Sequence, residues 1–299
     1  MDDDESIYVP PWLAMASLPG PLDSPPPPVN VEVGFGAQSR GGAQRSINDD
    51  HYLIMRMGRY EETLRTSLPA GVIPGRFDEC GYGMVIADGM AEAASRVAVS
   101  TLVHLAIYFG RWNVRVDEPI AAEVMDRAER FYRTIDSTLL QAARSSPGAL
   151  QSTLTAVYTA GAELFFAHVG DSRAYMFRDG ELLQLTRDHT RRGGRPAETV
   201  IMDLAERVQR ARPILSETLG KPGPGTPRID VERCGLLDGD VILLCTNGLT
   251  SVADDVRIAG ALRSHRTPDD QCGALMDLVA SAEGPDDATA VVAHYHVGA

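Results

Sequence analysis

The chain has 299 residues, of which 44% are hydrophobic and 23% are charged, and its formal net charge at pH 7 is −13. A chain of this length buries roughly three quarters of its unfolded surface, so its core requires neither a disulfide nor a metal. The acidic balance excludes a fold-wide basic surface for nucleic acid and disfavours an anionic membrane surface. The four cysteines include no C-x-x-C pair, which excludes a zinc ribbon and indicates free thiols in a reducing compartment.

Two features of the chain bear on its location. The sequence opens with Met-Asp-Asp-Asp-Glu, which is acidic where a secretory signal would be basic. No apolar run approaches the ~20 residues needed to span a bilayer. We therefore expect a cytoplasmic protein with no nucleic-acid and no membrane partner.

The composition divides the chain at about residue 30. Residues 1–30 combine the acidic opening with a run of four prolines at 25–28, which is typical of a disordered tail or spacer. From residue 31 onward the apolar pattern is that of a folded protein, and we expect one domain over 31–299.

The first half of that domain begins with two strands, at 51–57 and 82–87, joined by an irregular excursion over 58–80. Apolar residues at helical spacing then predict helices at 91–108 and 121–143. Four short apolar runs follow, punctuated by Gly161, Gly170-Asp171 and Asp179-Gly180 as hairpin turns. The strands expected from these runs are 153–159, 163–168, 173–177 and 182–186.

The second half opens with a segment rich in Arg, Gly and Pro, residues 187–228, that holds one short helical stretch at 200–211. Strands at 229–233 and 241–245, helices at 254–265 and 269–282, and a last strand at 288–296 complete the pattern. Strands thus flank helix pairs instead of alternating with single helices. That order favours an α+β fold of antiparallel sheets with helices packed outside, and it argues against a doubly wound parallel sheet.

Acidic residues recur where predicted strands begin or end. They are Asp49-Asp50, Asp88, Asp171 and Asp286-Asp287, and each alone is compatible with an ordinary turn. If the strand ends meet at one rim of a sandwich, the carboxylates form a site of hard oxygen donors, which suits Mg²⁺ or Mn²⁺. Two such ions activate a water and neutralise a phosphoryl group. Arg45, four residues before Asp49, adds a bidentate contact for phosphate.

With these motifs in order, the sequence resembles the metal-dependent phosphatases of the protein phosphatase 2C (PPM) family, in its bacterial form. The resemblance covers residues 31–296. The most specific pieces are Val-Gly-Asp-Ser-Arg and Leu-Thr-x-Asp-His in this order. The segments that carry it are 45–50 (RSINDD), 85–90 (VIADGM), 152–156 (STLTA), 168–173 (HVGDSR), 185–189 (LTRDH), 243–249 (LLCTNGL) and 286–290 (DDATA).

The resemblance implies a four-layer α-β-β-α sandwich whose rim binds two Mn²⁺ or Mg²⁺ ions, with a doubtful third. It implies hydrolysis of phosphoserine or phosphothreonine on a phosphorylated protein by a two-metal-activated water. Arg45 matches the family's phosphate-binding arginine. The matches to its metal positions are Asp49 and Asp50 (an acidic pair that binds or supports one ion), Asp88 (the bridge between both ions), Gly89 (a backbone carbonyl), Asp171 (the weaker third ion) and Asp286 (the C-terminal aspartate).

Three positions depart from the family pattern. Asn247 replaces a metal-binding aspartate, Ser251 replaces a second one, and Met90 is followed by Ala-Glu where relatives carry glycines. An amide still donates its carbonyl oxygen to a hard cation, but it brings no charge, so metal affinity should fall. Two hypotheses follow: a working phosphatase with a weakened metal site, or a pseudophosphatase that binds a phosphoprotein without turnover. Because only one core ligand has changed, we expect the enzyme.

Overall fold

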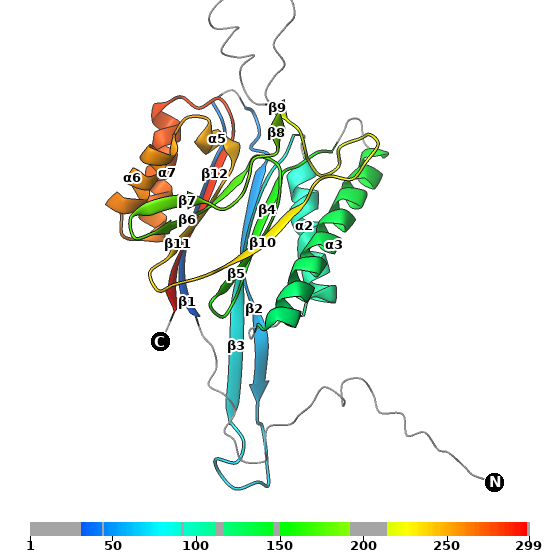
Figure 1. Ribbon diagram of the computed structural model, residues 1–299, viewed down its shortest axis with the longest axis vertical. Coiled ribbons are helices and arrows are strands. Elements are labelled where there is room, and N and C mark those ends of the chain that lie inside the picture. The colour runs from blue at the N-terminus through cyan, green and yellow to red at the C-terminus, as the bar shows by residue number, and fades with distance from the viewer. Residues whose placement is uncertain are drawn as a thin grey trace, which may run out of the picture.

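The computed structural model describes residues 31–43, 45–90, 93–111, 116–145, 150–191 and 214–297. The predicted tail over 1–30 and the predicted helix over 200–211 lie outside these residues. Two five-stranded antiparallel sheets, here called sheet I and sheet II, form the centre of the molecule (Figure 1).

The strands of each sheet come from both halves of the chain. In sheet I the order is β1 (Val31–Arg40), β12 (Ala288–Val297), β11 (Val241–Cys245), β6 (Arg173–Arg178) and β7 (Glu181–Gln184). In sheet II the order is β10 (Asp230–Gly235), β5 (Glu163–Val169), β4 (Leu154–Ala160), β3 (Arg76–Asp88) and β2 (Asp50–Glu62). A small third sheet pairs β8 (Thr190–Arg191) with β9 (Ile214–Leu215).

Helices cover the outer face of each sheet (Figure 1). The helices against sheet II are α2 (Ala94–Phe109) and α3 (Glu118–Ala143), whereas α5 (Asn247–Thr250), α6 (Asp255–Ser264) and α7 (Pro268–Ser281) lie beside sheet I. Asp117 and Asp254 cap α3 and α6 by accepting a backbone N–H three residues later. In the described part of the chain, no helix combines the length and apolar character needed to cross a bilayer. The predicted four-layer sandwich is confirmed.

Alternation along the central strands explains how one chain fills three apolar layers. In β3, Met84 and Ile86 pack into the core between the two sheets, whereas Val85 and Ala87 pack beneath α2 and α3. In β11 the same alternation places Ile242 and Leu244 between the sheets and their neighbours beneath α6 and α7. Strands buried on both faces read as continuous apolar runs. For that reason the sequence predicts a strand over 241–245, and the structure confirms both of its bounds.

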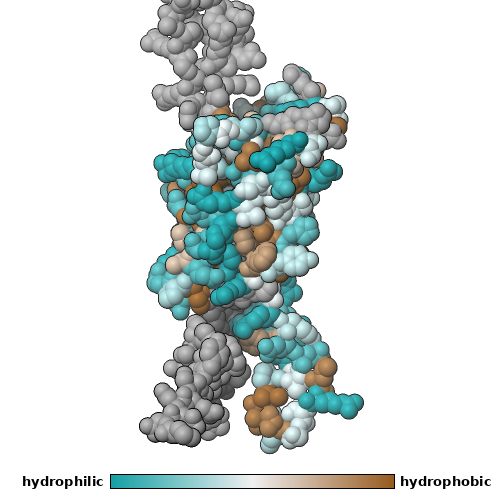
Figure 2. All heavy atoms as spheres, turned by 90° about the vertical axis from the view of Figure 1, so that its right-hand side faces the viewer, coloured by the Kyte–Doolittle hydropathy of each residue, from teal (hydrophilic) through white to brown (hydrophobic). Residues whose placement is uncertain are grey.

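The expected irregular excursion over 58–80 is wrong at both of its ends, because residues 58–62 and 76–80 belong to strands. Strand β2 continues to Glu62 and β3 begins at Arg76, so a long hairpin extends beyond the other strands of sheet II (Figure 1). Ion pairs from Arg56 to Asp78 and from Arg59 to Glu79 bridge its two strands. Exposed apolar side chains lie toward its end, as Figure 2 shows. Polar residues on both faces hide a strand from a hydrophobicity pattern.

The expected hairpin turn at Gly170-Asp171 is also wrong, because β5 belongs to sheet II and β6 belongs to sheet I. The chain crosses between the sheets at this point, and Gly170 adopts φ +123°, a value that side chains disfavour. A Cβ at Gly170 would lie 2.6 Å from Thr153. The other two turns, at Gly161 and Asp179-Gly180, do join paired strands. The crossover brings Asp171 to the rim between the sheets.

Candidate metal centre

Asp50 and Asp88 face one another across two paired strands. Asp50 is the first residue of β2 and Asp88 is the last residue of β3, and the antiparallel register places them directly opposite. Asp50 is buried, with 6% of its surface exposed. The structure therefore brings together two of the carboxylates that the sequence places at strand ends.

Two threonines hold the Asp50 carboxylate. Thr246 and Thr289 donate hydrogen bonds of 2.7 and 2.8 Å to its Oδ2, whereas its buried Oδ1 has no hydrogen-bond partner among the described residues. Burial raises the pKa of Asp50 to about 7; the two hydroxyls oppose the shift, and the nearby charges of Asp287 and Asp286 add to it. A buried carboxylate oxygen without a donor is the group that a cation would satisfy.

The backbone of Asp88 is fixed from the neighbouring strand. Its N–H donates to Thr153 Oγ1 at 3.0 Å, and its carbonyl accepts from Ser152 Oγ at 3.1 Å and from the Thr153 N–H at 2.9 Å. Burial raises the pKa of the Asp88 carboxyl well above its usual range, and the charges of Asp50, Asp171 and Asp286 raise it further. These four carboxylates consequently form one electrostatic cluster.

The side chains of Asn247 and Asp171 meet within the cluster. Asn247 begins the short helix α5, one residue after the end of β11, and its Nδ2 lies 3.3 and 3.4 Å from the two oxygens of Asp171. Burial raises the pKa of Asp171, while the hydrogen bond from Asn247 lowers it. An aspartate at 247 would place two like charges at this contact, so the amide relieves a repulsion at the same position where it removes a charged ligand.

Arg45 pairs with Asp286 at the exposed edge of the cluster. Its Nη2 and Nε lie 2.5 and 3.0 Å from Asp286 Oδ1, and both side chains are about two fifths exposed. This hydrogen bond raises the pKa of Arg45, and the charges of Asp286, Asp287 and Asp88 act in the same direction. The guanidinium is thus held beside the carboxylates at a position that solvent reaches.

Asp49 and Gly89 belong to the wall of the site, next to the start of α2. The Ser95 hydroxyl donates to the Asp49 backbone carbonyl and bonds His51 Nδ1 at 2.9 Å. A Cβ at Gly89 would lie 2.9 Å from Ser95 Oγ and 3.0 Å from that same carbonyl, so the close approach requires glycine.

The structure places two of the residues that depart from the family pattern. The Ser251 hydroxyl donates to the Gly248 carbonyl, and the Met90 side chain is exposed. Residues 91 and 92 lie outside the described ranges.

The donor set fits a divalent cation. Asp50, Asp88, Asp171 and Asp286 supply hard oxygens, and among the described residues the positive charge of Arg45 acts on Asp88 and that of Arg173 on Asp171. Within the described residues no three carboxylate, imidazole or thiol groups already converge on a common point, because Asp286 turns to Arg45 and Asp171 to Asn247. A cation would therefore draw these two carboxylates from their present partners.

Sequence reasoning missed four residues that shape the site. Thr246, Thr289 and Asp287 lie within the family motifs but have no role assigned from sequence, and Ser95 lies outside those motifs. Asp287 accepts 2.9 Å hydrogen bonds from the Gly42 and Asp49 N–H groups. A signal existed for the threonines, because each is a polar residue at the end of an otherwise apolar strand.

Known proteins are similar to this chain in sequence and in fold. The family model described as Protein phosphatase 2C matches residues 76–280. "Serine/threonine protein phosphatase PstP" of Mycobacterium tuberculosis is 30% identical over 218 residues, which is 70% of this chain and 40% of that protein. "Serine/threonine phosphatase stp" of Listeria innocua is 24% identical over 221 residues, or 70% of this chain and 82% of the relative. The chain thus spans about two fifths of the mycobacterial relative.

The crystal structure of the PstP catalytic domain, in complex with two manganese ions, covers 89% of this chain and all of its own. It superposes with a TM-score of 0.63 at 24% identity, which shows the shared fold. The matched segment exceeds half of the chain and includes the crossover, β11 and α5. The chain belongs to the protein phosphatase 2C family.

Proposed function

We propose that this chain is a metal-dependent phosphatase that hydrolyses phosphoserine and phosphothreonine on proteins. The observation that carries the proposal is the cluster of Asp50, Asp88, Asp171 and Asp286, which is exposed at Asp286, where Arg45 lies at its edge. The family membership and the names of the relatives support it.

Two Mn²⁺ or Mg²⁺ ions would be held by the side chains of Asp50, Asp88 and Asp286, together with the Gly89 carbonyl and the Asn247 amide oxygen. Asp49 would support the same site beside its neighbour Asp50. Asp171 would hold a weaker third ion. Bound ions supply charge neutralisation at the phosphoryl group and lower the pKa of a water. Thr246 and Thr289 orient Asp50 by occupying one carboxylate oxygen and leaving the other without a donor.

Arg45 is assigned to the phosphate. Its guanidinium presents paired N–H donors, which match two phosphate oxygens as they match a carboxylate. In the structure these donors contact a single oxygen of Asp286. Substrate phosphate would therefore replace Asp286 on Arg45 and leave that carboxylate for an ion.

The second hypothesis, binding of a phosphoprotein without turnover, rests on Asn247 alone. The remaining carboxylates and Arg45 are all present, and the amide retains an oxygen donor. These observations favour the enzyme. We also propose that the substrate is a cytoplasmic phosphoprotein, and the net charge of −13 supports a chain without nucleic-acid or anionic membrane partners.

The test measures hydrolysis of an aryl phosphate and of a phosphothreonine peptide while Mn²⁺ is titrated. Asp88→Asn should reduce turnover by at least about a hundredfold, because it removes the central carboxylate of the cluster. Asp277→Asn, the same change at an exposed position of α7, is the matched control and should leave turnover unchanged. Metal-independent turnover, or equal turnover in wild type and Asp88→Asn, would contradict the proposal.

A further inference from the structure

The β2–β3 hairpin extends beyond its neighbour in sheet II. Strand β4 pairs with β3 only from Gly83 to Ile86, whereas β2 and β3 remain paired as far as Glu62 and Arg76 (Figure 1). A two-stranded ribbon is marginally stable in water, and a third strand or a packed helix is what stabilises it. The end of this hairpin is therefore a place where a further strand would add stability.

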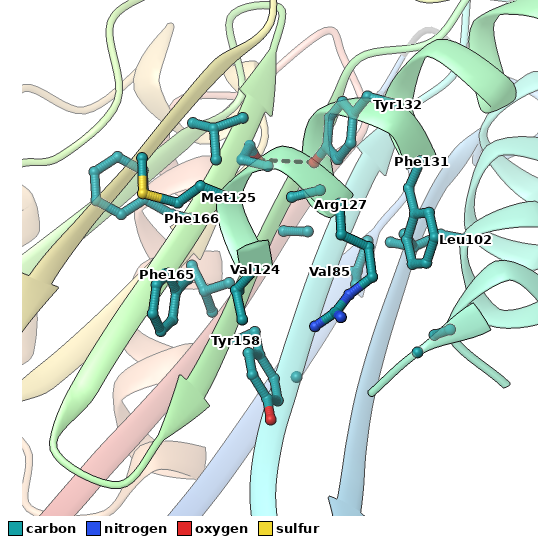
Figure 3. Close-up of a pocket in the computed structure, with 18 of the residues that line it drawn as sticks. Val85, Leu102, Val124, Met125, Arg127, Phe131, Tyr132, Tyr158, Phe165 and Phe166 are labelled. Atoms are coloured by element: carbon teal, nitrogen blue, oxygen red, sulfur yellow. Dashed lines mark hydrogen bonds between the residues drawn. The ribbon is translucent and has the colours of Figure 1, made fainter. Parts of the chain in front are cut away.

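The helices cover the base of the hairpin. There Met57 lines an apolar pocket between sheet II and the helices, together with Val124 and Phe131 of α3 (Figure 3). From position 58 to position 62, every residue of β2 is exposed. Large apolar side chains with exposed fractions between 39% and 84% follow in the connection to β3, namely Leu64, Leu68, Val72 and Ile73. Clustered exposed apolar side chains mark interaction sites.

The outer edge of β2 is long and regular. Its 13 residues pair with β3 in a single register without a bulge, and the strand contains no proline. In the described part of the chain, β2 is the last strand of sheet II. Short length, bulges and prolines are the features that prevent an edge strand from pairing with another chain. This edge has none of them.

The register shows which backbone groups of β2 point outward. The Thr63 N–H donates to the Gly75 carbonyl at 2.9 Å, and these two positions continue the pairing of the ladder. Backbone hydrogen bonds in an antiparallel pair recur at every second residue. The N–H and C=O groups at positions 59 and 61 therefore face β3, and those at positions 58, 60 and 62 face outward.

The side chains along this edge are complementary to a second copy of themselves. When two β2 strands pair antiparallel about a twofold axis at Tyr60, the outward groups of Tyr60 meet their equivalents and Arg59 lies opposite the partner's Glu61, twice. An axis at Arg59 would oppose two arginines, and an axis at Glu61 would oppose two glutamates. Like charges directly opposite are destabilising, so the charge pattern selects the axis at Tyr60.

The present contacts of these side chains are compatible with that register. The Arg59 Nη2 donates to Glu79 at 3.1 Å, and its side chain is 56% exposed. Because a guanidinium carries five N–H donors, Arg59 can bind a second carboxylate without releasing the first. Tyr60 is 57% exposed, and the Arg76 guanidinium lies over its ring at 5.1 Å.

We propose that two copies of this chain associate edge to edge through residues 57–63 of β2, antiparallel about a twofold axis at Tyr60. The two hairpins then form one four-stranded sheet, which gives each ribbon the additional strands that it lacks alone. Asp50 and Asp88 lie at the opposite end of the same two strands. Association therefore does not depend on the proposed phosphatase activity, and it is measured without metal or substrate.

The test is sedimentation velocity of the full chain from about 1 to 200 µM, since a small interface binds weakly. We expect a reversible dimer. Glu61→Arg opposes two pairs of arginines and should weaken association at least about tenfold. Asp277→Arg, the same change of charge at an exposed position of α7, is the matched control and should not alter it. A wild type that is monomeric throughout, or a Glu61→Arg variant that associates like the wild type, would overturn the proposal.

A mixture of two variants tests the register itself. Arg59→Glu alone opposes two pairs of glutamates and should be monomeric. Mixed with Glu61→Arg it should form a dimer of one copy of each, because every opposed pair is again arginine with glutamate. Tyr60→Glu places like charges at the axis without changing the Arg59–Glu79 ion pair, and it should also be monomeric. If the mixture stays monomeric although both variants keep the wild-type circular dichroism, or if Tyr60→Glu dimerises, the register is wrong.

Amide hydrogen exchange identifies the edge in the wild type. The Tyr60 N–H should exchange more slowly as the protein concentration rises, because only the dimer supplies its acceptor. The Glu61 N–H, which faces β3, should exchange at a rate that does not depend on concentration. A dimer in which Tyr60 exchange is independent of concentration would overturn the proposal, because its interface would lie elsewhere.

Discussion

The carboxylate of Asp287 accepts a hydrogen bond of 2.9 Å from the backbone N–H of Asp49, although 238 residues separate the two in sequence. Its other oxygen accepts the Gly42 N–H at the same distance. One buried side chain thus ties down both ends of the segment that carries Arg45. The position of the proposed phosphate-binding arginine consequently depends on a residue that touches neither the phosphate nor the guanidinium.

Asp287→Asn tests that dependence. An amide has one accepting oxygen and presents an NH₂ group to the second N–H, so one buried donor loses its partner. We expect a loss of about 1–3 kcal/mol in the free energy of unfolding, measured by urea titration. We also expect KM for an aryl phosphate to rise more than kcat falls, because the Arg45 segment loosens. An unchanged KM in a stably folded variant would show that the segment is held by other contacts.

Asn247→Asp has opposite effects without and with metal. Without metal, a carboxylate placed beside Asp171 adds a repulsion where an amide now donates hydrogen bonds, so Tm should fall. With Mn²⁺ the added charge should lower the metal concentration for half-maximal hydrolysis by about tenfold, since ligand charge sets the affinity of such sites. Turnover in this variant but none in wild type would support the pseudophosphatase.

Replacement of glycine by alanine should have opposite effects on stability at two positions, Gly248 and Gly260. A Cβ at Gly248 would lie 2.0 Å from the Asp287 carbonyl oxygen and 2.8 Å from its carbon, both backbone atoms. Gly248→Ala should therefore displace the segment before β12 and cost about 3 kcal/mol of stability. At Gly260, inside α6, a Cβ would enter open space, so Gly260→Ala should gain up to about 1 kcal/mol from helix propensity. Thermal melting of both variants checks the contrast.

The pH dependence of stability should report on a buried histidine. His168 is fully buried, bonds Thr155 and the Gly170 carbonyl, and lies beside the His189 ring. Burial lowers the pKa of His168 to about 4, and the neighbouring His189 acts in the same direction. Below about pH 6.5 the unfolded chain gains a proton that the folded chain excludes. The contribution of His168 to stability should therefore fall between pH 6.5 and 4, by about 3 kcal/mol in full, whereas the raised pKa values of Asp50, Asp88 and Asp171 contribute with the opposite sign over the same range.

Urea titrations at pH 7.5, 6 and 5 measure this slope. His168→Gln keeps a donor for the Gly170 carbonyl; it should be less stable at pH 7.5, and on acidification its free energy of unfolding should fall less, or rise more, than that of the wild type. His104→Gln, an exposed change on α2, should retain the slope of the wild type. If His168→Gln keeps the full slope, another group is responsible.

Whether the sequence predicts a given strand, turn or site contact depends on the interactions that stabilise it. Strands buried on both faces, such as 241–245, follow from their unbroken apolar runs, and the meeting of Asp50 with Asp88 follows from strand ends at one rim. The extension of β2 to Glu62 does not follow, because charged cross-strand pairs stabilise it instead of apolar burial. The turn residues Gly170-Asp171 are the same sequence signal whether the next strand pairs with the preceding one or joins the other sheet.

The role of Asp287 could not be predicted from the sequence, for a different reason. Its partners are backbone N–H groups, which every non-proline residue possesses, so the residue types at positions 42 and 49 do not indicate the hydrogen bonds to Asp287. The pairing of Asp171 with Asn247 likewise depends on the crossover between the sheets.

The pairing of β1 with β12 has a consequence for how the protein folds. Arg40 lies opposite Ala288, so sheet I is completed only when two segments that are far apart in the sequence meet. Asp286 and Asp287 directly precede β12, and the same pairing brings them to Arg45 and to the Asp49 backbone. Contacts over such a separation form slowly. We therefore expect the carboxylate centre to form together with this long-range pairing and not with the local hairpins.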